Sequence, residues 1–269
     1  MKISPYLLIS IILNVLAFRY FRDRKIQFSS KNEYLAIVSA ALIGLASPLP
    51  TYAAIPIGLS LKNSGIPFSA VMAFILSSPL MNPTIFFLTA TQISLEMAVA
   101  RTISAFLLAI TGGLLAIRFS GVLAPVITKA LVERKPHDRS LWMDIYGNTK
   151  YIVKYFSIAI LLSAAVKALI PPETIAALLG GNAKVSTLVA IGMGVPFYTC
   201  GGSAIPFMET LMEMGLQKGP MLAFFLAGPA TKLETLYAYK SGFGTRILLF
   251  YLVLTLLFSY AAGLIYSFL

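Results

Sequence analysis

Long uncharged runs dominate this chain and predict helices that cross a membrane. The runs occupy residues 3–18, 34–61, 63–95, 102–117, 185–208 and 247–269. A run of about 17–25 apolar residues is long enough to span a bilayer as a helix. The runs are continuously apolar, whereas the strands of a membrane barrel alternate between apolar and polar residues. The pattern therefore predicts an all-α polytopic membrane protein with about 8–10 transmembrane segments.

Proline and small polar residues interrupt several of these runs. The interruptions fall at residues 47–51 and 77–83, and again at 195–203 and 228–232. Proline removes a backbone donor and disturbs the preceding turn, and backbone groups freed at membrane depth must find partners. Transporters use such groups in broken helices near the midplane to hold an ion or a polar solute. Proline kinks that serve packing alone are the alternative interpretation.

The candidate substrate-binding residues are therefore the small or polar residues at these interruptions. They are Pro50, Thr51, Ser78, Asn82, Thr199, Cys200, Ser203 and Thr231. Cys200 is the best single candidate, since it lies beside Thr199 and a Gly-Gly pair. The alternative for Cys200 is the ordinary one of a small buried hydrophobic residue.

Charged residues near the interruptions are candidates for coupling. Glu209 and Glu213 lie four residues apart and share a helix face. They form either a proton relay or an acidic face at the membrane interface. Lys232 either extends toward the cytoplasmic interface, neutralises a nearby glutamate or binds an anionic substrate. Glu96 and Arg101 are expected to pair at the end of a loop.

The two halves of the chain resemble each other at an offset of 150 residues. Ala54–Ile55–Pro56 falls on Ala204–Ile205–Pro206, Gly65 on Gly215 and Pro79 on Pro229. Apolar helices resemble one another through composition alone, but paired prolines and glycines at one fixed offset are harder to obtain by chance. We expect a first transmembrane repeat with its N-terminal helix over residues 1–130, a cytoplasmic linker over 131–150 and a second repeat over 151–269.

Positive charge is distributed unequally between equivalent segments, which favours inverted repeats. Residues 19–33, 118–154 and 232–246 hold 15 of the 21 Lys and Arg residues. The equivalents of the first and third segments, 169–183 and 82–96, hold none. Since Lys and Arg are enriched in cytoplasmic loops, equivalent loops would lie on opposite sides, as in many transporters. An inverted arrangement requires an odd number of membrane crossings in each half. A break at Pro48–Leu49–Pro50 would supply the fifth crossing of the first half. With four crossings per half, the halves would be parallel.

Composition excludes several classes of function. The net charge is +11, but the basic residues lie between apolar runs, which indicates membrane topology rather than nucleic-acid binding. A single cysteine excludes an internal disulfide. No enzyme, metal or cofactor motif is present, so no cofactor is expected. The expected partners are the lipid bilayer and a small-molecule or ion substrate, and a homo-oligomer is left open.

The interrupted runs also resemble a known family. Val195–Pro196–Phe197–Tyr198–Thr199–Cys200 and the stretch from Ala223 to Thr231 are similar to the signature of a predicted-permease family that includes bacterial permeases for organoarsenical efflux. Ser78–Pro79–Leu80–Met81–Asn82–Pro83 resembles the first-half motif of that family. The resemblance covers roughly residues 34–95 and 185–265. It implies a multi-pass permease of the cell inner membrane, not an enzyme.

Two departures from the family pattern bear on the substrate. The family often has a cysteine pair just before the Ile-Pro step, where this chain reads Ser47–Pro48–Leu49–Pro50–Thr51. Lys232 stands where the family usually has asparagine. Trivalent arsenic prefers several thiolates, and this chain offers only Cys200. We therefore expect a secondary permease that exports an unidentified solute or ion; a channel-like uniporter and a non-transporting subunit of a membrane complex are the alternatives.

Overall fold

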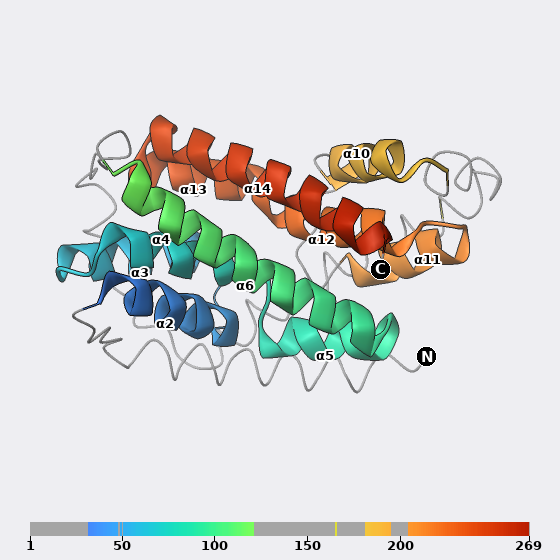
Figure 1. The fold of residues 1–269 in the computed structure, drawn as a ribbon, viewed down its shortest axis with the longest axis horizontal. Coiled ribbons are helices and arrows are strands. Elements are labelled where there is room, and N and C mark those ends of the chain that lie inside the picture. The colour runs from blue at the N-terminus through green and yellow to red at the C-terminus, as the bar shows by residue number, and fades with distance from the viewer. Residues whose placement is uncertain are drawn as a thin grey trace.

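The computed structural model describes residues 32–47, 49, 51–120, 165, 181–194 and 204–268, and every regular element among them is an α-helix (Figure 1). The helices are α2 (Glu33–Ala46), α3 (Thr51–Asn63), α4 (Phe68–Ser77), α5 (Pro83–Gln92), α6 (Leu95–Arg118), α10 (Ala183–Gly194), α11 (Ile205–Glu213), α12 (Lys218–Ala230), α13 (Leu233–Phe243) and α14 (Thr245–Ser267). The all-helical class expected from the apolar runs is confirmed for these residues.

The predicted interruptions divide the long runs into shorter helices. Run 34–61 becomes α2 and α3, and run 63–95 becomes α4 and α5. The start of α5 shows the local cause. The Asn82 side-chain oxygen accepts a hydrogen bond from the Ile85 amide at 2.9 Å, and Pro83 occupies the first turn. Because an amide there has no partner within the helix, proline costs nothing at this position, and a new helix begins.

Equivalent helices begin at the offset seen in the sequence. α2 and α10, α4 and α12, α5 and α13, and α6 and α14 each begin 150 residues apart. The turn before α4 contains Gly65 at φ +89°, and the turn before α12 contains Gly215 at φ +104°. In both turns the glycine amide donates to a carbonyl three residues back, and the next amide donates five residues back. This is a helix end that glycine favours, since the left-handed region strains other residues.

Within each half, three helices pack together. α2, α4 and α6 contact one another, and so do α10, α12 and α14. The close approach of α12 and α14 depends on glycine. A Cβ atom added to Gly263 would lie 2.8 Å from the Ala223 Cβ and 2.9 Å from the Gly219 carbonyl oxygen. Small residues at such crossings let the backbones approach each other and strengthen van der Waals packing.

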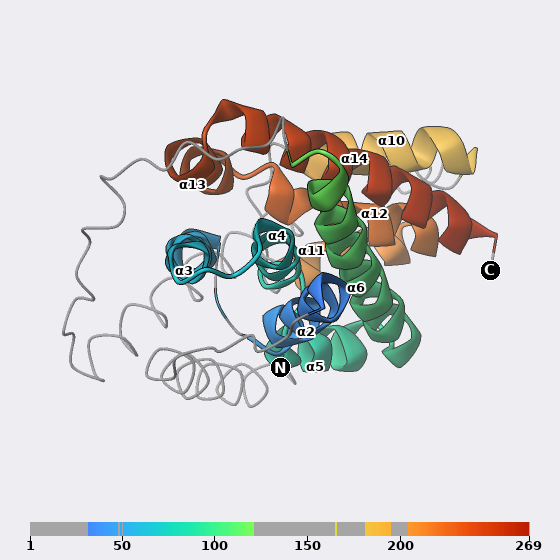
Figure 2. The same ribbon diagram turned by 60° about the vertical axis from the view of Figure 1, so that its left-hand side comes forward.

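The shorter helices exchange partners between the halves. α3 of the first half packs against α13 of the second (Figure 2). α5 of the first half packs against α11 of the second. The long helix α6 also contacts α12 and α14. The halves are therefore interlocked by helices that follow or precede the interruptions.

The two longest helices run in opposite directions. The start of α6 lies beside the end of α14, because the Tyr266 hydroxyl donates to Glu96 Oε1 at 2.8 Å. Farther along, a Cβ atom added to Gly112 would lie 3.1 Å from Leu254 Cδ2. The residue numbers rise on α6 as they fall on α14, as Figure 1 shows. α6 and α14 are equivalent in the 150-residue offset, yet they are antiparallel.

The start of α2, the C-terminal end of α6 and the start of α14, which each adjoin a basic segment, lie at one end of the molecule. The Ser69 hydroxyl donates to Glu33 Oε1 at 2.6 Å, and a Cβ atom on Gly113 would lie 3.1 Å from the Ser69 carbonyl oxygen. The start of α2 therefore lies near the C-terminal end of α6. The antiparallel α14 begins at this end too.

Segment 232–246 was expected to be a basic loop, and this expectation is wrong in one respect. Most of this segment is the helix α13. Lys240 and Arg246 are exposed near its C-terminal end, but Lys232 at its start is only 8% exposed. The interruption after Pro229 explains this difference, because it starts a new helix inside the protein rather than at its surface.

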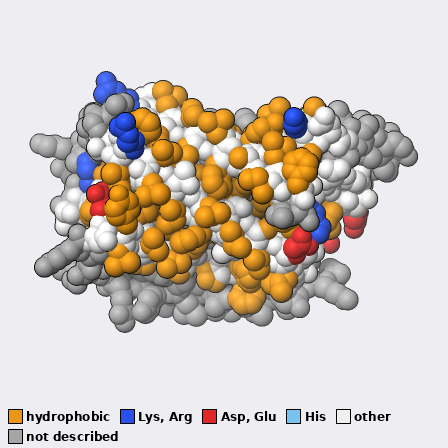
Figure 3. All heavy atoms as spheres, viewed as in Figure 1, with side chains coloured by type: hydrophobic (Ala, Val, Ile, Leu, Met, Phe, Trp, Pro, Cys, Tyr) orange, Lys and Arg blue, Asp and Glu red, His pale blue; other side chains and the backbone are white. Residues whose placement is uncertain are grey.

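The outward faces of the long helices are apolar. Leu95, Val99, Ile103 and Leu107 are exposed on α6, and Leu249, Val253 and Leu257 on α14. Figure 3 shows apolar side chains across the middle of this face, with most charged side chains toward its two ends. Among the described residues, α6 and α14 are the helices long and apolar enough to cross a membrane. Such a face is what contact with lipid requires.

Candidate functional site

The structure describes part of the predicted site. Ser78, Asn82 and Thr231 are described with their side chains. Thr51 is the first residue of α3, and its side chain lies outside the description. Pro50, Thr199, Cys200 and Ser203 lie outside the described residues. Their proposed contact with substrate stays a prediction.

The two interruptions of the first half meet each other. The Ser78 hydroxyl, which is fully buried, donates to the Leu49 carbonyl oxygen at 3.2 Å. Ser47 is also fully buried, and its hydroxyl makes no hydrogen bond in the structure. The break between α2 and α3 is thus joined to the break between α4 and α5 by a hydrogen bond from a side chain to the backbone, in addition to apolar packing.

Asn82 and Thr231 use their side chains to shape the interruptions. Asn82 is 8% exposed and caps α5. The Thr231 hydroxyl lies 3.3 Å from the carbonyl oxygens of both Ala227 and Gly228, at the end of α12. Pro229 has no amide hydrogen and cannot donate to the Phe225 carbonyl. Both residues therefore hold the ends of broken helices in place, which is a positioning role.

The charged candidates differ in their surroundings. Lys232 occupies the position before α13 that Asn82 occupies before α5, 150 residues earlier, but it makes no capping hydrogen bond there. Glu209 and Glu213 both lie on α11, as expected; Glu209 is half-buried and Glu213 is exposed. A role in proton coupling for either glutamate stays a prediction.

One buried charge was not among the residues that the sequence pattern indicated. Arg101 is fully buried in α6. Its Nη1 donates to the Thr89 hydroxyl and its Nη2 to the Leu80 carbonyl oxygen, each at 3.3 Å. The guanidinium carbon also lies 4.4 Å from the centre of the Phe225 ring. The expectation that Arg101 pairs with Glu96 at a loop end is wrong, since Arg101 lies inside the protein beside the first-half interruption.

Arg101 connects elements from both halves of the chain. Leu80 lies in the interruption between α4 and α5, Thr89 on α5, and Phe225 on α12. A cation over an aromatic ring is attracted by the ring quadrupole, and more strongly where water is excluded. The signal that could have identified Arg101 is its place as the one charge between Glu96 and Arg118 in an apolar helix.

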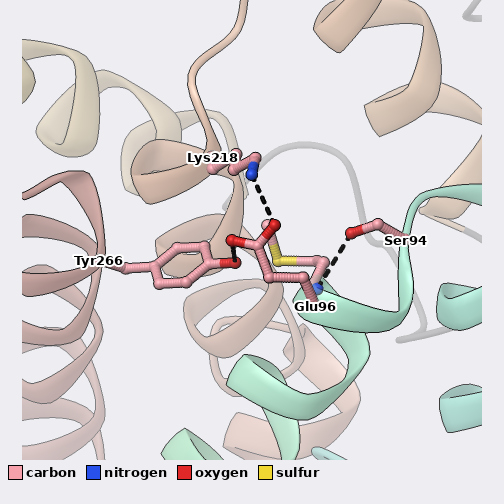
Figure 4. Close-up of polar contacts among 5 residues, drawn as sticks. Ser94, Glu96, Lys218 and Tyr266 are labelled. Carbon is pink, nitrogen blue, oxygen red and sulfur yellow. Dashed lines mark hydrogen bonds and ion pairs between the residues drawn. The ribbon is translucent and has the colours of Figure 1, made fainter. Parts of the chain in front are cut away.

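A second contact closes the α6–α12 interface nearer the surface. Lys218 Nζ at the start of α12 donates to Glu96 Oε2 at 2.6 Å, and the Tyr266 hydroxyl donates to the other carboxylate oxygen (Figure 4). The Lys218 and Glu96 side chains are 59% and 57% exposed. We call Glu96, Lys218 and Tyr266 the outer cluster. Arg101 and Phe225 form a deeper contact across the same two helices.

Comparison with known proteins assigns the chain to a family. The model of the family ArsP_1, described as predicted permease, matches residues 1–268. The chain is 31% identical over 150 residues to the UPF0718 protein MJ0584 of Methanocaldococcus jannaschii, a match that spans 54% of this chain and 40% of that protein. It is 24% identical over 272 residues to the UPF0718 protein YcgR of Bacillus subtilis, which spans 94% of this chain and 90% of YcgR.

No solved structure matches the chain. The family match extends over nearly the whole sequence, and it includes the interruptions, Arg101 and the outer cluster. A family of permeases accounts for the apolar outer face and for the broken helices together. The chain belongs to the predicted permease family ArsP_1.

Proposed function

We propose that this protein is an inner-membrane secondary permease that exports a small solute or ion. The substrate passes between the two halves of the chain, which are inverted repeats. The interruptions at 47–51 and 77–83 and their equivalents in the second half form the site. Pro50, Thr51, Thr199, Cys200 and Ser203 are proposed to line it. Ser78, Asn82 and Thr231 hold its helix ends.

The antiparallel directions of α6 and α14 carry this proposal. These helices begin 150 residues apart in the sequence, and the glycine turns at Gly65 and Gly215 have the same hydrogen bonds. If the halves are repeats, equivalent helices with opposite directions mean that one half is inverted relative to the other. Inverted repeats around broken helices are the architecture of many secondary transporters.

The distribution of charge agrees with this arrangement. The start of α2, the C-terminal end of α6 and the start of α14 each lie beside a basic segment and meet at one end of the molecule. By the positive-inside rule this end is cytoplasmic. The outer cluster lies at the opposite end, beside segment 82–96, which contains no Lys or Arg. In the described conformation the outer cluster holds α6 and α12 together at that end. Alternating access then requires the outer cluster to separate.

The proposal is tested by the flux of a panel of solutes through purified protein in proteoliposomes. The panel contains an organoarsenical, metal ions, oxyanions and small metabolites. Pro50→Ala, Asn82→Ala, Cys200→Ser and Thr231→Ala are compared with the wild type. Thr91→Ala is the control, because Thr91 is exposed on α5 and bonds only within its own helix.

We expect at least one solute to cross, and Asn82→Ala to lower its flux by about tenfold or more, since small displacements of a site are costly. Thr91→Ala should transport as the wild type does. Normal flux in all four variants would refute a site at the interruptions. A wild-type protein that moves no solute would instead favour the membrane-complex subunit.

A further inference from the structure

Four cations gather at the end of the molecule where α6 stops and α14 begins. They come from four helices, α3, α6, α13 and α14. We call them the basic rim, which consists of Lys62, Arg118, Lys240 and Arg246. Figure 3 shows Lys and Arg side chains at this end of the outer face. Glu33 lies at the same end, so among the described side chains there the cations outnumber the acid.

Aromatic contacts hold α3 and α13 at this end. Lys62 Nζ lies 5.7 Å from the centre of the Phe68 ring, and the Phe68 and Phe243 ring centres are 6.1 Å apart. Phe68 is the first residue of α4, which starts at the same end as α2. Phe243 is the last residue of α13, one turn after Lys240. The basic rim therefore surrounds one corner of the protein.

The basic rim has no acidic partner in the described part of the chain. Three of its side chains are exposed and the Lys62 side chain is half-buried. None of the four forms an ion pair or a side-chain hydrogen bond with another described residue. Lys218, near the opposite end, is instead paired with Glu96. Because like charges repel one another, a negatively charged partner would stabilise the basic rim.

Two of these cations lie directly beyond the apolar outer face. Leu114 precedes Arg118 by four residues on α6, and Leu249 follows Arg246 by three on α14. Residues at these spacings share a helix face. Leu114 is 41% exposed and Leu249 is 55% exposed. An acyl chain that runs along these leucines would place its headgroup beside the two guanidinium groups.

The partner that this placement fits is an anionic phospholipid. Its acyl chains require the apolar face, and its phosphate requires cations just beyond that face. A guanidinium can bind two oxygens of one phosphate at once. A soluble anion would use the cations alone and would leave the adjoining apolar face without a role. The cytoplasmic leaflet carries anionic lipids, and the positive-inside rule makes this end of the protein cytoplasmic.

We propose that the basic rim binds the headgroup of an anionic phospholipid of the cytoplasmic leaflet. Arg118 and Arg246 bind the phosphate, and Lys62 and Lys240 add positive charge around it. The bound lipid joins the end of α6, in the first half, to the start of α14, in the second. This inference goes beyond the proposed transport function and does not depend on it.

The test uses the full chain, with phosphatidylglycerol as the anionic probe and phosphatidylcholine as the zwitterionic reference. Spin-labelled lipids in reconstituted membranes report how strongly each headgroup associates with the protein. Thermal unfolding in detergent, at equal mole fractions of the two lipids, gives a second measure. The variants are the pair Arg118→Gln with Arg246→Gln and the pair Lys62→Gln with Lys240→Gln.

Lys184→Gln is the matched control. Lys184 is an exposed cation in the first turn of α10. One turn later, Thr187 lies within 2.9 Å of a Cβ atom added to Gly263, near the end of α14. The control therefore removes the same kind of charge from the opposite end of the molecule.

We expect phosphatidylglycerol to associate with the wild type about three- to tenfold more strongly than phosphatidylcholine, because each cation near the membrane surface attracts anionic lipid. The arginine pair of substitutions should remove most of this preference, and the lysine pair a smaller part. Lys184→Gln should keep it in full. High salt should weaken the preference in the wild type.

The arginine pair should fold normally, because substitutions of exposed side chains without partners change stability little. Its unfolding temperature in phosphatidylcholine checks this. Equal association of the two lipids with the wild type would overturn the proposal, and so would a preference that the arginine pair of substitutions leaves intact.

Glycerol phosphate separates a lipid site from a site for a soluble anion. We expect it to raise the unfolding temperature much less than phosphatidylglycerol does, since it lacks the acyl chains. Equal stabilisation by the two at the same concentration would overturn the lipid site. A protein that prefers phosphatidylglycerol through the basic rim, yet moves no solute, would support this inference while contradicting transport.

Discussion

At the scale of residues, two contacts across α6 and α12 have opposite characters. The outer cluster is an exposed ion pair joined by the Tyr266 hydroxyl. Exposed ion pairs add little stability and are weakened by salt. Arg101 and Phe225 are buried, so their contact is less affected by water and salt. The outer cluster can therefore separate at low cost, whereas the deeper contact is the more persistent of the two.

Glu96→Gln should loosen the surface end of this interface. Met97, which is 1% exposed behind Glu96, is replaced by cysteine in a Cys200→Ser background. Loss of the ion pair should raise the rate at which a membrane-impermeant maleimide labels position 97 by about two- to fivefold. High salt should also raise the labelling rate of the Met97→Cys protein that keeps Glu96.

The control for this measurement is Glu33→Gln, which removes an exposed acid at the other end of the molecule. Its labelling rate at position 97 should equal that of the unmodified Met97→Cys protein. Equal labelling rates with and without Glu96 would mean that the outer cluster does not hold α6 and α12 together.

The sequence could not identify the environment of Arg101. Its contact with Phe225 joins residues far apart in the chain, and the pattern of a single helix contains no information about such a partner. Asn82 and Pro83 act locally, by contrast, and a helix start there follows from their chemistry alone. For the same reason Glu96 could not be matched with Lys218 before the helices were placed.

At the scale of elements, the positions of the prolines in the sequence were enough to predict that the long apolar runs divide into shorter helices. α3, α5, α11 and α13 begin at or next to these interruptions. The exchange of partners between α3 and α13 and between α5 and α11 was not predictable, because short apolar helices carry no marker of which surface they cover. The close crossing of α12 and α14 depends on Gly219 and Gly263, whose importance appears only when both backbones are in place.

Gly263→Ala should destabilise the protein. The added methyl group would press against Ala223, the Gly219 backbone and Thr187, each within 2.9 Å, and overpacking typically costs about 1–3 kcal/mol. A lower thermal unfolding temperature in detergent is the expected result. Gly192→Ala on α10 is the control, since a Cβ atom there meets nothing within 4 Å. Equal losses in the two variants would show that the α12–α14 crossing tolerates the extra group.

At the scale of the whole molecule, the described residues beside the basic segments 19–33 and 118–154 lie at one end. Glu96, in the segment 82–96 that holds no Lys or Arg, lies at the other end of α6. The charge pattern predicts that equivalent loops lie on opposite sides, but it does not explain how four apolar runs per half would produce this. The divided helices supply the explanation, because a short helix can return toward the surface from which its predecessor came. Inverted repeats remain our proposal for the chain.

Cysteine labelling tests this topology directly. Ala90→Cys and Ala176→Cys are introduced singly in a Cys200→Ser background and treated with an impermeant maleimide in intact cells. Both positions should react from outside, because segments 82–96 and 169–183 contain no Lys or Arg. Arg139→Cys, in the basic segment 118–154, should react only after the cells are opened. Cytoplasmic labelling at position 90 or 176 would refute the inverted arrangement.

The exchanged short helices also set an order for biogenesis. α3 packs against α13, whose first residue follows the last residue of α3 by 170 positions. A ribosome adds about 5–20 residues per second, so α3 emerges roughly ten to thirty seconds before its partner. During that interval the surface of α3 that α13 will cover must be shielded by lipid, by the insertion machinery or by a temporary neighbour. Docking of the two halves is thus a late step of folding, and the first half made alone would lack the partner that completes it.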